Sequence, residues 1–171
     1  MAFCLLCTLT RDAFYMPWAV EEWESTHPAD VFAQESFIFT ARSSSCILHF
    51  ENDSPAGART VLVDQVTVLA LVEGRKVGLR NPSFELNELS DDSNGYMVAQ
   101  PNGWRASGCP NNCGVRIVQN SLMTYGRISS QSGDFFIELF AAGSWVEHEL
   151  TDLLTGEHPP LPLTLSTLPL R

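Results

Sequence analysis

The sequence predicts an all-β fold, an antiparallel β-sandwich. Short runs rich in Val, Ile, Leu and Phe alternate with turns rich in Gly, Ser, Asn and Pro, about every 8 to 12 residues. No segment keeps a helical period of 3.6 residues for more than a few turns. The chain has 171 residues, 44% of them hydrophobic and 18% charged. That length and composition are sufficient for one domain with its own core.

The first segment, residues 1–30, is poorly defined. It opens with an apolar run that lacks a basic n-region, so it is a poor signal peptide and reads as a short core strand or as a consequence of where the chain begins. No run of about 18 apolar residues occurs, so the sequence predicts no membrane span.

The first half of the predicted sandwich comprises residues 31–72. Strands at 36–42 and 46–51 flank a serine turn, so we expect them to pair as an antiparallel hairpin. Residues 60–71 form the strongest predicted strand. Asp64 shares a face of that strand with four apolar residues, and an inward carboxylate is costly unless it has a partner.

The second half comprises residues 79–158, with an aromatic segment at 96–104 and strands at 115–119, 134–140 and 144–150. Residues 159–171 form a Pro- and Leu-rich tail. Its four prolines reduce the number of N–H donors, so we expect no central strand there.

Two stretches carry a resemblance to a known fold. Asn81-Pro82-Ser83-Phe84-Glu85, followed by Gly103-Trp104, is similar to the N-terminal signature of galactose-binding-like β-sandwiches with a jelly-roll fold. That group includes carbohydrate-binding modules and a cell-wall-associated domain of unknown function from plants and microbes. Residues 60–68 resemble the closing strand of the same fold.

The closing strand precedes the opening motif, so the chain resembles the C-terminal half of one module (31–72) followed by the N-terminal half of the next (79–158). Two arrangements follow from this order. The chain is a slice of a tandem-module protein with neighbouring modules as partners, or both halves complete one circularly arranged sandwich.

The resemblance implies a structural calcium ion near the first and last strands, held by Asp64 and Glu85. Calcium takes six to eight oxygen ligands, including backbone carbonyls, and such an ion would explain an inward carboxylate. The alternative is that Asp64 caps a turn or pairs with Arg80 or Arg59.

The resemblance also implies a non-catalytic carbohydrate-binding module of a larger extracellular or cell-wall protein, with a polysaccharide or other glycan as its partner. Sugars pack their C–H faces on aromatic rings and bond their hydroxyls to planar polar side chains. The candidate ligand-binding residues are Tyr96, Gln100, Asn102, Trp104, Arg105 and Tyr125, with Trp145 as a further option. For Trp104 the favoured alternative is a core position, since the Gly-Trp of this fold is often buried.

Charge and motifs exclude other functions. The net charge of −10 argues against binding to a nucleic-acid backbone or an anionic membrane. No HExxH, GxSxG, P-loop or GxGxxG motif occurs, so the chain is not expected to be an enzyme, although a divergent hydrolase fragment is a weaker hypothesis. We expect His49 and His148 at outward, solvated strand positions. The main alternative to sugar binding is a structural or adhesive β-sandwich that binds proteins.

The cysteines allow two interpretations. Cys109 and Cys113 are close enough in sequence to bridge across a turn, and Cys46 is a lone thiol in a strand. A zinc site formed by Cys4, Cys7, Cys109 and Cys113 is the alternative.

Overall fold

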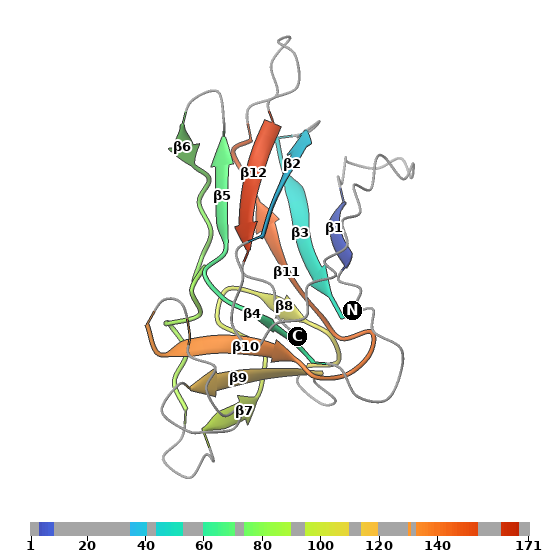
Figure 1. Cartoon of the computed structure of the whole chain (residues 1–171), viewed down its shortest axis with the longest axis vertical. Coiled ribbons are helices and arrows are strands. Elements are labelled where there is room, and N and C mark those ends of the chain that lie inside the picture. The colour runs from blue at the N-terminus through green and yellow to red at the C-terminus, as the bar shows by residue number, and fades with distance from the viewer. Residues whose placement is uncertain are drawn as a thin grey trace.

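The computed structural model describes residues 4–8, 35–40, 44–52, 60–70, 74–89, 95–109, 114–119, 130, 133–153 and 162–167. Within these residues the regular structure is entirely β: twelve strands, all paired antiparallel, and no helix (Figure 1). The all-β prediction is therefore confirmed. None of the described residues belongs to a helix long and apolar enough to cross a membrane.

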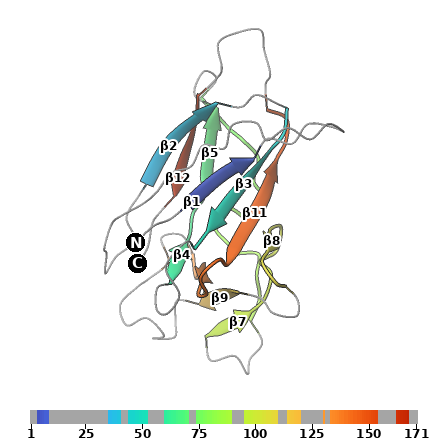
Figure 2. The ribbon, with the colours of Figure 1, turned by 90° about the vertical axis from the view of Figure 1, so that its right-hand side faces the viewer.

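The strands form three four-stranded sheets. The first sheet has the order β1 (Cys4–Thr8), β3 (Cys46–Glu51), β11 (Trp145–Leu150) and β8 (Arg105–Ala106). The second has the order β4 (Val61–Val63), β10 (Phe135–Leu139), β9 (Val115–Gln119) and β7 (Tyr96–Val98). The third has the order β2 (Glu35–Thr40), β12 (Pro162–Thr167), β5 (Thr67–Ala70) and β6 (Arg75–Lys76). Figure 1 shows β9 and β10 of the second sheet running across the direction of β3, β5 and β12, and Figure 2 shows β7 and β9 below β1, β3 and β5.

The alternation of residues along β3 places one set of side chains in the core. Cys46, Leu48 and Phe50 are fully buried, whereas the residues between them are partly exposed, as the sequence pattern predicts. In the β3–β11 pair, Val146 lies opposite Phe50. Directly opposite residues share a face of the sheet, so β11 continues the same apolar surface.

One cluster of buried side chains draws on all three sheets. It includes Phe50 and Val146 from the first sheet, Val61 and Ile137 from the second and Val68 from the third. The sheets therefore share one core rather than forming separate units.

Residues 60–71 do not form a single strand, which corrects the prediction. The chain leaves β4 at Asp64, passes through Gln65 with a φ of 49°, and enters β5 in a different sheet. Asp64 accepts a hydrogen bond from the Gln65 N–H at 2.7 Å, which satisfies a donor at the bend. An apolar run rich in β-branched residues carries no signal for such a left-handed residue.

The predicted hairpin between residues 36–42 and 46–51 is also wrong. β3 is paired on both edges, with β1 and β11, so it has no free edge for β2. β2 instead pairs with β12 in the third sheet.

The tail supplies β12, a central strand between β2 and β5, contrary to the expectation from its prolines. The only proline within β12 is Pro162, its first residue, where a missing N–H is tolerated. Residues 163–167 keep their backbone donors.

The two predicted half-modules are joined strand by strand. β3 from residues 31–72 pairs with β11 from residues 79–158, and β4 pairs with β10 in the same way. β1 and β12, from the segments outside the predicted sandwich, also belong to the sheets.

Candidate functional site

The first sheet carries polar and aromatic side chains on the face opposite the core. His49 and Glu51 come from β3, Trp145 and Glu147 from β11, and Arg105 from β8. In the register of these strands, Trp145 lies opposite Glu51, and Glu147 lies opposite both His49 and Arg105. These five residues, called the outer face below, therefore share one side of the sheet.

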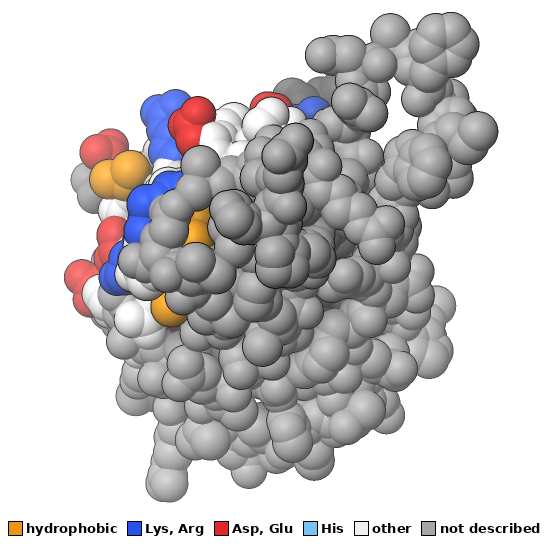
Figure 3. All heavy atoms as spheres, turned by 90° about the horizontal axis from the view of Figure 1, so that it is seen from above, with side chains coloured by type: hydrophobic (Ala, Val, Ile, Leu, Met, Phe, Trp, Pro, Cys, Tyr) orange, Lys and Arg blue, Asp and Glu red, His pale blue; other side chains and the backbone are white. Residues whose placement is uncertain are grey.

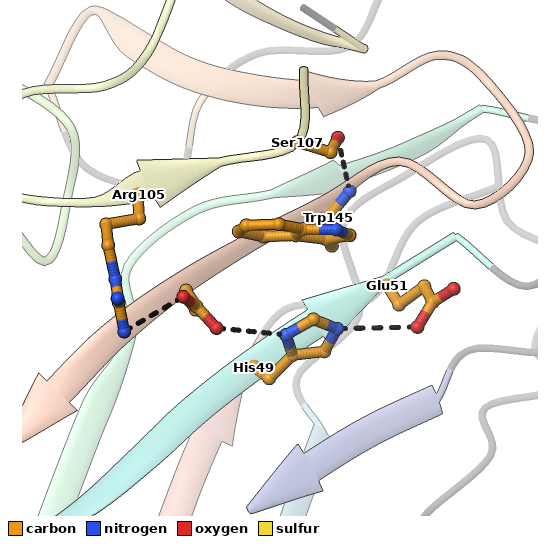
Figure 4. Close-up of polar contacts among 6 residues, drawn as sticks. His49, Glu51, Arg105, Ser107 and Trp145 are labelled. Atoms are coloured by element: carbon orange, nitrogen blue, oxygen red, sulfur yellow. Dashed lines mark hydrogen bonds and ion pairs between the residues drawn. The ribbon is translucent and has the colours of Figure 1, made fainter. Parts of the chain in front are cut away.

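Glu147 joins two neighbours on the outer face (Figure 4). One of its oxygens is 2.9 Å from the Arg105 guanidinium, and the other is 3.5 Å from His49 Nδ1. The second imidazole nitrogen of His49 lies 3.4 Å from a Glu51 oxygen. The two imidazole contacts are long for hydrogen bonds, so they hold the side chains loosely.

Exposure differs along this row. The side chain of His49 is 12% exposed and that of Glu147 is 17% exposed, whereas Glu51 reaches 35% and Arg105 reaches 64%. The row therefore runs from a sheltered centre to two accessible ends.

Trp145 supplies the aromatic surface. Its ring centroid lies 5.4 Å from that of His49 with an interplanar angle of 33°, and the residue is partly exposed. Its backbone N–H donates to Ser107 Oγ at 2.9 Å, which fixes the start of β11 to the turn after β8. An indole surrounded by planar hydrogen-bonding groups is suited to a sugar ring.

Trp104 occupies the core, the favoured alternative for this residue. It is 2% exposed, and its indole N–H donates to the Asn81 carbonyl at 3.1 Å. Its ring packs against those of Phe50, Phe84 and His148. The Asn81–Glu85 turn and the Gly103-Trp104 pair thus meet as one structural unit.

His148 points toward the core side of the first sheet, so the predicted outward position is wrong. It lies opposite the buried Leu48 and makes an edge contact with Trp104 at 5.0 Å. Its Nε2 accepts the Arg80 N–H at 3.0 Å, and its Nδ1 lies 2.8 Å from the Glu149 carbonyl. A backbone N–H only donates and a carbonyl only accepts, so these contacts require the neutral ring with the proton on Nδ1.

Burial lowers the pKa of His148 below its usual 6.5. The hydrogen bond to the Glu149 carbonyl and the charge of Glu149 act in the opposite direction but are weaker. His49, in contrast, lies outward as predicted, although its carboxylate neighbours and Trp145 shelter it.

The other candidates are dispersed, and Tyr96 lies in β7. Tyr96 is partly exposed, and the Arg116 guanidinium lies 4.8 Å above its ring and 4.2 Å from the ring of Phe140. Gln100 is exposed, and Tyr125 lies outside the described residues. Among the candidates that the structure describes, Arg105 and Trp145 lie on the outer face.

Asn102 is exposed but its polar groups hold the local turn together. Its backbone N–H donates to Asn87 Oδ1 at 2.8 Å, and its side-chain amide donates to the Leu86 carbonyl. Its own carbonyl accepts from the Asn81 side chain at 2.9 Å. These bonds give Asn102 a structural role in the turn.

Glu85 caps the start of β10. Its two carboxylate oxygens accept the N–H groups of Asp134 and Phe135, each at 2.9 Å. Gly133, with a φ of 74°, lies so close that a Cβ there would collide with this carboxylate. Both the left-handed backbone and the space require glycine at this position.

Asp64 is fully buried, and the bend that contains it lies next to the turn that carries Glu85, where the Val66 N–H donates to the Pro82 carbonyl at 2.8 Å. The described residues include no group of three or more His, Cys, Asp or Glu suited to a metal, so an ion here would depend on backbone carbonyls. The calcium site stays a prediction.

Cys109 is disulfide-bonded, and Cys113, its predicted partner, lies outside the described residues. A cysteine in a disulfide has no thiolate to offer a metal, which removes Cys109 from the zinc alternative. Cys46 is buried and is not part of a disulfide, as expected.

No family model, curated protein or solved structure matches this chain. The resemblance to galactose-binding-like modules therefore stays a prediction.

Proposed function

We propose that this chain is a non-catalytic carbohydrate-binding module of a larger extracellular or cell-wall protein, built as a β-sandwich of the galactose-binding-like kind, and that its outer face binds the glycan. The observation that carries the proposal is Trp145, a partly exposed indole beside the His49, Glu147 and Arg105 side chains. A pyranose would place its C–H face on the indole and its hydroxyls on the carboxylate and guanidinium groups.

The Arg105–Glu147 ion pair supports this proposal because it holds two planar groups in place before a ligand arrives. Its 2.9 Å contact is a charge-assisted hydrogen bond. Groups that are ordered in advance lose less conformational entropy on binding. The strands beneath them provide a rigid base.

The disulfide at Cys109 supports an extracellular location. Disulfides persist in oxidising compartments and are rare in the cytosol.

The alternative function, an adhesive β-sandwich that binds proteins, would require an exposed apolar patch of several hundred Å². Among the described residues, the large hydrophobic side chains that are well exposed are Leu86 and Val98. On the small described part of the face in Figure 3, acidic, basic and hydrophobic side chains are intermixed. This surface favours a polar ligand over an apolar protein interface.

A glycan array with the purified chain and a Trp145→Ala variant tests the proposal. We expect wild type to bind a restricted set of glycans and Trp145→Ala to lose about tenfold or more in affinity, since a central aromatic residue dominates such contacts. Glu88→Gln, which alters an exposed carboxylate elsewhere, is the matched control and should bind normally. Absence of binding to any glycan, or equal binding by Trp145→Ala, would show the proposal to be wrong.

A further inference from the structure

The outer face has more acidic than basic side chains. Glu51 and Glu147 lie on it with Arg105, and the exposed Glu149 continues the same side of β11. The whole chain has a net charge of −10. A ligand with carboxylate or sulfate groups would be repelled here, and a cationic one attracted.

The two carboxylates differ in their partners. Glu147 is already neutralised by Arg105 at 2.9 Å. Among the described residues, Glu51 makes its polar contact with the imidazole of His49, at 3.4 Å, and forms no ion pair with a lysine or arginine. At 35% exposed, Glu51 is an accessible anion available to an incoming cation.

Glu51 is also next to the aromatic surface. It lies directly opposite Trp145 across the β3–β11 pair, where side chains on one face are about 5 Å apart at Cβ. A ligand that stacks on the indole would therefore place its ring substituents within reach of this carboxylate.

We propose that the outer face binds glycans that contain a protonated amino sugar, with the sugar ring on Trp145 and the ammonium group on Glu51. This inference rests on the proposed function and specifies its ligand class. A protonated amine combines a positive charge with three donors, which matches an accessible carboxylate. An N-acetylated sugar keeps the ring but has no charge, so it would gain only the stacking contact.

The test compares two oligomers of equal length, one of glucosamine and one of N-acetylglucosamine, by isothermal titration calorimetry. The two oligomers differ in charge, because the free amine of glucosamine can take up a proton and the N-acetyl group cannot. We expect the glucosamine oligomer to bind about fivefold more tightly, the upper range for one partly exposed ion pair. This preference should shrink at high ionic strength, because salt screens exposed charges.

Variants separate charge from stacking. Glu51→Gln should abolish the preference for the glucosamine oligomer, whereas Trp145→Ala should weaken the binding of both oligomers. Glu88→Gln should retain the preference. The unfolding midpoint of each variant shows whether the variant is folded. If Trp145→Ala does not fold, Trp145→Phe, which keeps an aromatic ring, is measured in its place.

Equal affinity of wild type for both oligomers would overturn the amino-sugar assignment while leaving carbohydrate binding intact. An oligolysine of the same charge that binds as tightly would also overturn it, because charge alone would then suffice. Absence of binding to either oligomer, together with binding to other glycans on the array, would likewise overturn it, whereas absence of all glycan binding removes the proposed function itself.

Discussion

Two tryptophan–histidine pairs lie on opposite faces of the same sheet, and they differ in what holds them. On the outer face, Trp145 stacks near His49 at 5.4 Å, and the imidazole contacts two glutamate side chains. On the core side, Trp104 meets His148 at 5.0 Å, and both rings bond to backbone groups.

The difference separates a structural unit from a binding surface. Backbone partners are fixed by the fold, so the inner pair cannot change partners without disturbing the chain around it. The Glu51 carboxylate can turn toward a ligand at little cost, because it is partly exposed and its contact with His49 is long. We therefore expect the inner pair to control stability and the outer pair to control binding.

The largest expected effect is the loss of the inner indole. Trp104→Ala should reduce the free energy of unfolding by about 3 to 5 kcal/mol, since it removes a fully buried aromatic side chain and leaves a cavity. Trp145→Ala, at a partly exposed position, should cost about 1 kcal/mol. Urea unfolding of both variants measures the contrast, and equal losses would contradict it.

The turn that supports the inner pair should also be sensitive. In Glu85→Gln, an amide NH₂ replaces one of the two oxygens that accept the Asp134 and Phe135 N–H groups. We expect a loss of about 1 to 3 kcal/mol, the cost of a charge-assisted bond and an unsatisfied donor. Glu88→Gln, an exposed carboxylate in the same loop, should stay within about 0.5 kcal/mol of wild type. If both variants lose the same amount, the cap has no special role.

Local pattern in the sequence predicts part of this arrangement. Alternation places Cys46, Leu48 and Phe50 inward, because a strand of a half-buried sheet repeats every two residues. The favoured core role of Trp104 agrees with its burial. Asp64 stands out as an inward carboxylate, and it lies at the bend between two sheets.

Strand partners lie beyond local pattern. β2 pairs with β12, more than a hundred residues away along the chain, and nothing in either segment specifies that choice. The outer face depends on the same long-range register, because Trp145 and Glu51 come together only once β3 and β11 pair. Alternation along β11 places His148 on the face of the sheet opposite to Glu147 and Glu149. A histidine is stable on that inward face because both of its ring nitrogens have backbone partners, which the sequence does not reveal.

The inner histidine should make stability depend on pH. Its pKa is below 6.5 in the folded chain and about 6.5 in the unfolded chain, so the unfolded state binds more protons below about pH 6.5. The free energy of unfolding should therefore fall as the pH falls through that range, by at most about 1.4 kcal/mol per pH unit, and less because the ring is partly solvated. Above that range His148 contributes no pH dependence.

His148→Gln isolates this contribution. Glutamine keeps one acceptor and one donor group and gains no proton. Its unfolding free energy, measured between about pH 7.5 and 5, should fall less steeply than that of wild type. If the two proteins show the same slope, His148 does not contribute to the pH dependence of the free energy of unfolding.

Calcium should have the smallest effect on the free energy of unfolding, and it should distinguish the inner pair from the outer face most clearly. If Asp64 and Glu85 hold an ion, it stabilises the bend and turn beneath the inner pair, which the Val66–Pro82 bond already joins. Extracellular calcium modules bind with dissociation constants of about 10⁻⁴ to 10⁻³ M, so 1 mM calcium should add about 0.4 to 1.4 kcal/mol to the unfolding free energy relative to chelator. Asp64→Asn should remove this difference. Glycan affinity in calcium and in chelator should be the same, because the outer face contains neither carboxylate; a calcium-dependent affinity would instead mean that the two faces of the sheet are coupled.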